Sequence, residues 1–203
     1  MLRPPDPQAG RDVSKLGRHE HYCEPMARQI VLLRGINVGR NKRVRMDALR
    51  KLLTDLGYED VRTHLQSGNV VLTSSKSAKR LESELEKQLA AKLGLDIQVL
   101  VRTRNQLADV IKRNPLGKVA DNPSRYMVSF LSAKPTAKVV RELTKVDVAP
   151  EQFVISGREI YAWYPNGFQR AKLGKVLSEQ RLGVTATARN WNTVTKLLEL
   201  ADE

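Results

Sequence analysis

The order of apolar runs along residues 28–101 constrains the fold more than any other feature of this sequence. Short runs rich in β-branched residues predict strands, and leucines spaced three or four residues apart predict helices. The expected strands cover residues 28–34, 61–66, 70–74 and 97–101, and the expected helices cover residues 46–57 and 77–93. This β-α-β-β-α-β order is the split βαβ plan of ferredoxin-like domains.

The same order of elements returns after a joint at residues 104–124, although the two halves are not alike in sequence. The joint itself holds a short expected helix at 105–113. The expected elements that follow are strand 125–131, helix 136–145, hairpin strands 152–156 and 159–164, helix 171–182, strand 183–188 and a terminal helix 191–200. Strand 28–34 is apolar on both faces, so we expect the second half to cover part of the first sheet.

The predicted fold is therefore α+β: two ferredoxin-like (α-β plait) lobes packed together, plus a C-terminal helix. The expected division is a disordered N-terminal extension (1–25), a first lobe (26–103), a connecting helix and loop (104–124) and a second lobe with the terminal helix (125–203). A single mixed α/β domain is the alternative to two lobes.

Residues 1–25 carry several prolines and no apolar periodicity, which is typical of an extension without fixed structure. Met26 directly precedes the first strand and is a candidate for the original start of the chain. His19, His21 and Cys23 form an H-x-H-x-C group. A tetrahedral metal site needs a fourth ligand, so we interpret this group as a chance cluster and predict no metal site.

Charge favours an anionic partner. The chain has 35 Lys+Arg against 22 Asp+Glu in 203 residues, a net charge of +13. The charges of residues 1–25 cancel, so the whole excess belongs to residues 26–203. Nucleic acid or a nucleotide is the predicted partner, and solubility alone is the alternative explanation. One cysteine and the lack of a long apolar run favour a cytoplasmic protein without a membrane partner.

The loop after the first strand is the most informative stretch, with five basic residues and no acid between positions 34 and 45. Its glycines allow backbone shapes that point N–H groups at an anion, and the loop leads into the start of helix 46–57. The alternative is a solvated basic loop whose glycines only make turns. The candidate ligands of a phosphate or carboxylate here are Arg34, Gly35, Asn37, Gly39, Lys42 and Arg45.

Topology adds a second set of residues to this loop. In the split βαβ plan the 67–69 hairpin lies at the same sheet edge, so Gln66, Ser67 and Asn69 are expected to meet Arg34 and Asn37. Their amide and hydroxyl groups offer uncharged hydrogen bonds that orient a ligand. The alternative is that Ser-Gly-Asn is simply good turn chemistry.

A second basic stretch, 165–196, supplies the secondary candidates Lys172, Arg189, Asn190 and Trp191. Asn190 or Thr187 is expected to cap the terminal helix. Trp191 offers a ring for stacking on a base, but packing in the core is the favoured interpretation. Core packing is likewise favoured for an aromatic cluster that consists of Tyr161, Trp163, Tyr164 and Phe168.

Catalysis has no clear signature. Outside residues 1–25 the one histidine is His64, in the middle of an expected strand. The motifs H-E-x-x-H, G-x-S-x-G, C-x-x-C and the P-loop pattern are absent from the sequence. The residues therefore select no reaction and no cofactor.

The strings LLRGINVGRNKRVRMDALRKLLTDLGYEDVRTHLQSGNVVL (32–72) and TARNWNTVTKLLEL (187–200) closely resemble the DUF1697 family of uncharacterised bacterial proteins. The resemblance covers about residues 28–200. It implies two ferredoxin-like lobes and no established activity. It points to the strings LLRGINVG, QSGN and TARNWNTV, including Gly68, Thr187 and Thr193, and it departs at Ala171, where the family often has serine.

These observations predict a protein that binds a phosphate-bearing ligand, a nucleotide or nucleic acid, at the Gly35–Gly39 loop. Two alternatives remain open at this point. One is an enzyme that acts on a small anionic substrate between the lobes. The other is a scaffold whose basic surface meets an acidic protein partner.

Overall fold

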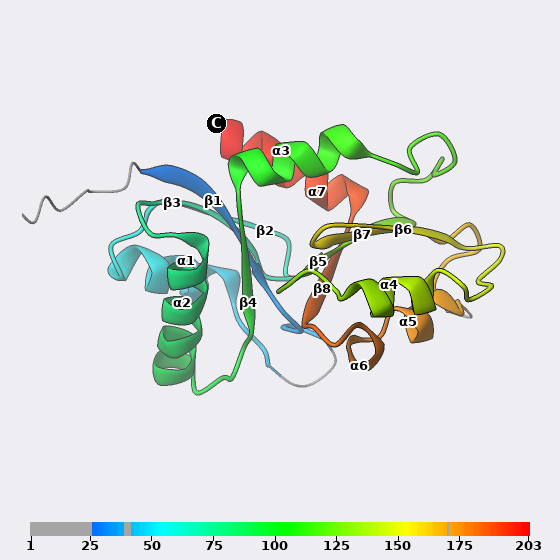
Figure 1. The fold of residues 1–203 in the computed structure, drawn as a ribbon. Helices are drawn as coiled ribbons and strands as arrows, with labels where there is room; N and C mark the ends of the chain where they lie inside the picture. The colour runs from blue at the N-terminus through cyan, green and yellow to red at the C-terminus, as the bar shows by residue number, and fades with distance from the viewer. Residues whose placement is uncertain (1–25, 39–41, 170) are drawn as a thin grey trace, which may run out of the picture.

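A computed structural model describes residues 26–38, 42–169 and 171–203. The predicted extension at residues 1–25, with the His19, His21 and Cys23 group, lies outside the described residues. Gly39 also lies outside them. Within the described ranges the chain forms two four-stranded sheets with seven helices around them (Figure 1).

The first lobe contains one antiparallel sheet in the strand order β2-β3-β1-β4, the order expected of the split βαβ plan. Its helices α1 and α2 lie on one face of this sheet (Figure 1). The elements are β1 (Ala27–Leu33), α1 (Met46–Asp55), β2 (Glu59–His64), β3 (Asn69–Ser74), α2 (Ala78–Leu93) and β4 (Val99–Thr103).

The second lobe repeats this plan with the strand order β6-β7-β5-β8, after helix α3 (Arg104–Arg113). The predicted pair of α-β plait lobes is thus confirmed. The elements are β5 (Tyr126–Leu131), α4 (Ala137–Leu143), β6 (Gln152–Ser156), β7 (Glu159–Trp163), α5 (Leu173–Val176), α6 (Glu179–Leu182), β8 (Ala186–Asn190) and α7 (Trp191–Asp202).

Two predictions for the second lobe are wrong. The single helix expected at 171–182 is two four-residue helices, because Ser178 adopts an extended backbone (φ −65°, ψ 149°) between them. The closing strand begins at Ala186 instead of 183, because Gly183 takes a left-handed conformation that ends α6.

The core is built in three layers. One apolar cluster lies between the first sheet and α1 and α2, and another lies between the second sheet and α4, α5 and α6. The third joins the lobes: Ile30 and Leu32 of β1 and Val128 and Phe130 of β5 pack with α3 and α7. This middle layer explains why β1 is apolar on both faces, as predicted from its sequence.

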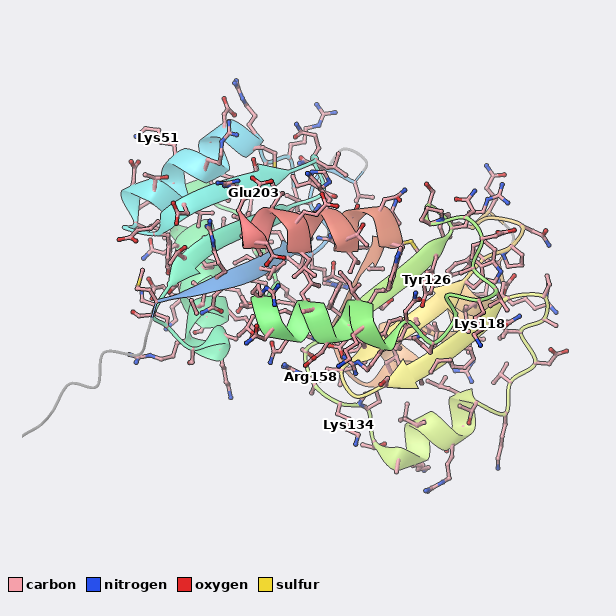
Figure 2. All side chains as sticks on the ribbon, turned by 90° about the horizontal axis from the view of Figure 1, so that it is seen from above. Lys51, Lys118, Tyr126, Lys134, Arg158 and Glu203 are labelled. Carbon is pink, nitrogen blue, oxygen red and sulfur yellow. The ribbon has the colours of Figure 1, made fainter. Side chains whose placement is uncertain are left out.

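Helices α3 and α7 lie side by side across both lobes (Figures 1 and 2). Each begins directly after the last strand of its lobe with a capped turn. Thr103 caps α3 in a reciprocal capping box with Gln106. Asn190 caps α7 by accepting a hydrogen bond from the Thr193 amide at 2.9 Å, which confirms one of the two predicted caps.

A buried arginine ties the first lobe to the second. Arg102 on β4 is fully buried and donates to the Leu131 carbonyl at 2.8 Å and to the Glu159 carboxylate at 3.1 Å. It also donates to the carbonyl of Arg158, which is labelled in Figure 2 at the turn between β6 and β7. Burial lowers the pKa of Arg102. Removal of a charged side chain from water is costly, so these partners fix how the lobes meet.

We predict that the protein loses stability as the pH rises above about 10. Burial raises the pKa of four tyrosines, to about 12 for Tyr126 and Tyr164 and further for Tyr58 and Tyr161. A raised pKa in the folded state contributes stability that is complete below the unfolded value and is lost as the pH climbs through the folded one. Burial lowers the pKa of Arg102 and Arg189, so these two groups add stability as the pH rises. They are outnumbered by the four tyrosines.

Tyrosinate absorbance and circular dichroism during an alkaline titration check this prediction. The fifth tyrosine, Tyr22, lies outside the described residues, so Tyr22→Phe removes its signal. Absorbance should rise together with the loss of secondary structure. Tyrosinate that forms near pH 10 in a chain with intact dichroism would contradict the burial of these hydroxyls.

Candidate functional site

The loop after β1 and the hairpin between β2 and β3 lie together, as the topology predicts. The Leu33 amide donates to the Gly68 carbonyl at 2.8 Å. The Asn37 side-chain amide donates to the carbonyls of Gln66 at 2.6 Å and Val44 at 2.9 Å, while its oxygen accepts from the Val44 amide. The Asn37 side chain therefore holds the two ends of the loop together and joins the loop to the hairpin.

Two glycines take left-handed conformations here, and one of them, Gly68, makes the close approach possible. Gly35 has φ +65° and Gly68 has φ +75°, conformations that favour glycine. A Cβ atom on Gly68 would come within 2.7 Å of Leu33 Cβ and within 2.8 Å of Ile36 Cδ1. The glycine of the Ser-Gly-Asn turn is thus required by packing between the hairpin and the loop.

Two main-chain amides of the loop already donate to main-chain carbonyls. The Arg34 amide donates to the Gln98 carbonyl at 2.9 Å, and the Asn37 amide donates to the Lys42 carbonyl at 3.1 Å. Lys42 itself donates from Nζ to the Asp96 carbonyl. These amides are occupied by protein acceptors, so the described part of the loop offers an anion fewer backbone donors than its sequence indicates.

The Arg34 side chain reaches the second lobe. Its Nη2 forms an ion pair with Glu179, and its Nε donates to the Ala186 carbonyl at 3.3 Å. Its Nη1 donates to Gln98 Oε1 at 3.0 Å. Sequence reasoning missed both side-chain partners, since Gln98 and Glu179 lie far from Arg34 along the chain. Arg34 is therefore part of the contact between lobes as well as a residue of the loop.

Arg189 is a second buried tie between the lobes. It extends from β8 and donates to the carbonyls of Leu33 and Ser67, both at 2.9 Å, and to the Asn69 side-chain oxygen. Burial lowers the pKa of Arg189 to about 10. Asn69 is itself fully buried and donates to the His64 carbonyl and to Ser67 Oγ at 2.9 Å each. Asn69 and Arg189 thus form a buried network, and the exposed Ser67 joins it at the surface through its hydroxyl and its carbonyl.

Exposed cations remain on the outer side of α1. Arg43, Arg45 and Arg50 are exposed, and the Arg45 side chain keeps 84% of its accessible surface. Arg45 pairs with Asp47 at 2.6 Å, which lowers the pKa of that carboxyl. A hollow of about 450 Å³ lies between Arg45 and Arg50, with Gln66 on its wall. We call Arg43, Arg45 and Arg50 the α1 basic surface; Arg50, one helical turn inside α1, was missed in the sequence.

The secondary candidates have separate partners instead of a shared site. Arg189 points to the first lobe and Asn190 caps α7. Trp191 stacks on Tyr126 with ring centroids 4.8 Å apart, which supports the packing interpretation; Figure 2 shows Tyr126 near the start of α7. Lys172 is exposed at a hollow of about 380 Å³ lined by Pro150 and Glu151.

Other predicted features are mostly structural. Tyr161, Trp163 and Tyr164 are buried, whereas Phe168 keeps half of its surface exposed. His64 is half-buried, and its pKa is lowered by burial and by Lys196. Among the described residues no cluster of His, Cys, Asp and Glu is arranged to hold a metal ion. None of the described helices has the length and apolar character needed to cross a membrane.

Replacement of Asn69 by alanine should destabilise the protein by about 1–3 kcal/mol, because it leaves the Arg189 guanidinium, the His64 carbonyl and the Ser67 hydroxyl each short of a hydrogen bond. Urea denaturation provides the measurement. Asn192→Ala is the matched control: its amide donates to Ser124 Oγ on the exposed surface, so we expect a change within about 0.5 kcal/mol. Equal effects of the two changes would refute the buried network.

Comparison with known proteins agrees with this architecture. Residues 26–161 match the family described as "Protein of unknown function (DUF1697)". The conserved bacterial protein SP0830 from Streptococcus pneumoniae has a similar structure, with a TM-score of 0.69 and 23% identity over 87% of this chain and 99% of that one. No curated protein in the comparison matches the sequence. The chain, with its two lobes and joined loop and hairpin, belongs to the DUF1697 family.

Proposed function

We propose that this protein binds the phosphate backbone of nucleic acid through the α1 basic surface. The observation that carries the proposal is the exposure of Arg43, Arg45 and Arg50, the last two of which line an open hollow, in a chain of net charge +13. The acid that pairs with this surface, Asp47, neutralises one of the three guanidinium groups. Arginine recognises phosphate through paired N–H donors, so exposed arginines suit a backbone ligand.

An extended polyanion fits this surface better than a single nucleotide. The amides of Arg34 and Asn37 already donate to protein carbonyls, which weakens the case for a compact phosphate cradle in the described part of the loop. The remaining donors are side chains spread over the outside of α1 and the turn before it. Phosphates spaced along a strand match such spread donors.

Binding of this kind would read the backbone instead of the base sequence. Both faces of the first sheet are covered, one by α1 and α2 and the other by the middle layer of the core. An open sheet face with aromatic side chains, on which RNA-recognition modules stack bases, is therefore not available in this lobe. Affinity should depend on salt because each neutralised phosphate releases counterions.

Fluorescence anisotropy with a labelled single-stranded RNA and a labelled duplex DNA, over a series of salt concentrations, tests the proposal. The triple variant Arg43→Ala, Arg45→Ala and Arg50→Ala should bind more weakly. The slope of log affinity against log salt should fall by about 1 for each phosphate that the variant no longer neutralises. A moderate decrease in affinity for all sequences is expected, since these arginines meet the backbone and not the bases.

The matched control removes three positive charges from another helix: Lys79→Ala, Lys87→Ala and Lys92→Ala at exposed positions of α2. It lowers the net charge by the same amount but should leave most of the affinity. An equal decrease in both triple variants would show that total charge alone drives binding. The absence of binding to either nucleic acid at low salt would overturn the proposal altogether.

A further inference from the structure

The two lobes correspond residue by residue along their last strands. Arg102 on β4 faces Ile30 on β1, and Arg189 on β8 faces Val128 on β5. Ile30 and Val128 each lie three residues before the last residue of their strand, and each arginine donates to the carbonyl of that last residue in the opposite lobe. The residues before them therefore correspond too: Val99 to Ala186 and Val101 to Ala188.

Carboxylates cover the outer edge of β4 in the first lobe. The outward amides of Val99 and Val101 donate to Glu86 Oε1 at 2.9 Å and Glu82 Oε1 at 2.8 Å. Both glutamates come from α2, one continuous helix of 16 residues. An edge strand otherwise presents unpaired N–H groups to solvent or to other chains.

The corresponding edge of β8 is covered at one position only. The Ala186 amide donates to Glu179 Oε1 at 2.6 Å, as Val99 does to Glu86. Amides alternate in direction along an antiparallel edge strand, so the Ala188 amide faces the same way as that of Ala186. Among the described residues no side chain accepts a hydrogen bond from Ala188, the counterpart of Val101.

A hollow of about 450 Å³ lies over this uncovered amide. In the first lobe Val31 and its partner Val101 fill the corresponding space under α2. In the second lobe the same positions hold Ser129 and Ala188, which pair with each other and line the hollow. Small side chains and the break between α5 and α6 together leave the space open, and its volume is in the range of ligand pockets.

Polar groups converge on the hollow. Arg34 stands at its rim, where its ion pair with Glu179 leaves further N–H donors on the guanidinium. Ser178 lies at the start of α6, but its hydroxyl makes no capping hydrogen bond. Ser129 adds a second hydroxyl to the lining. The hollow thus offers an amide, two hydroxyls and the remaining N–H donors of Arg34 to one ligand. The Glu179 carboxylate also lines it, and both of its oxygens already accept hydrogen bonds, one from Arg34 and one from the Ala186 amide.

We propose that this hollow binds a small organic carboxylate, whose carboxylate group accepts from the Ala188 amide as Glu82 accepts from Val101 in the first lobe. A carboxylate oxygen bonded to a main-chain amide beside a guanidinium makes strong, charge-assisted hydrogen bonds. The second lobe supplies most of the lining and Arg34 of the first lobe stands at the rim, but the hollow shares no residue with the α1 basic surface, so the proposal does not depend on nucleic-acid binding.

Amide NMR spectroscopy with succinate as the probe tests this site on the full chain. The Ala188 amide resonance should move in a saturable way. The Val101 amide, which is already occupied by Glu82, should stay in place and serves as the internal control. Sodium chloride at equal ionic strength and neutral succinamide should move neither resonance. An Ala188 amide that stays unmoved by succinate, or moves equally with chloride or succinamide, would overturn the proposal.

The double variant Ser129→Val and Ala188→Val gives the second lobe the side chains of the first. It should fold with an unchanged or higher melting temperature, since it fills space beside an apolar cluster, and the amide at position 188 should no longer respond to succinate. A response as strong as in the unaltered protein would contradict the site. If this variant fails to fold, the comparison of Ala188 with Val101 in the unaltered chain still decides the question.

Discussion

Two buried arginines determine how this protein holds together. Arg102 reaches from the first lobe to the second, and Arg189 reaches back. Each ends on the carbonyl of the last residue of the first strand and on the hairpin turn of the opposite lobe. A buried guanidinium is costly unless its donors find acceptors. The two lobes can therefore pack closely only in the orientation that satisfies both side chains.

This exchange changes the meaning of the strings that mark the family. The Ser-Gly-Asn turn and the TARN segment look like ligand-binding chemistry when each is read alone. In the folded chain Ser67 and Asn69 accept hydrogen bonds from Arg189. The absence of a side chain on Gly68 leaves space for Leu33 and Ile36. Arg34 likewise belongs to the basic loop by sequence, but its ion pair with Glu179 makes it part of the contact between the lobes. The groups of these strings that stay open to an external ligand are the Ala188 amide and the remaining N–H donors of Arg34, at the hollow beside β8.

The near-symmetry of the lobes makes their differences informative. The first lobe covers its edge strand with the continuous helix α2 and fills the space below with valines. In the second lobe, two short helices replace the continuous one, and Ser129 and Ala188 replace the two valines. The proposed carboxylate site depends on this difference between the covered edge of β4 and the partly uncovered edge of β8. Nucleic-acid binding rests instead on exposed charge, so the two proposals depend on separate parts of the molecule.

The sequence alone determined the element order and the packing of the lobes, because periodicity of apolar residues reports directly on strands, helices and buried faces. Apolar residues on both faces of β1 were enough to predict a covering lobe. The break between α5 and α6 depended on the backbone of Ser178, which leucine spacing does not reveal. Tertiary structure decided which groups Arg34, Asn69 and Arg189 bind. Arg34 pairs with Glu179 and Asn69 with Arg189 across more than a hundred residues of sequence, and only the fold shows whether a cation meets protein or solvent.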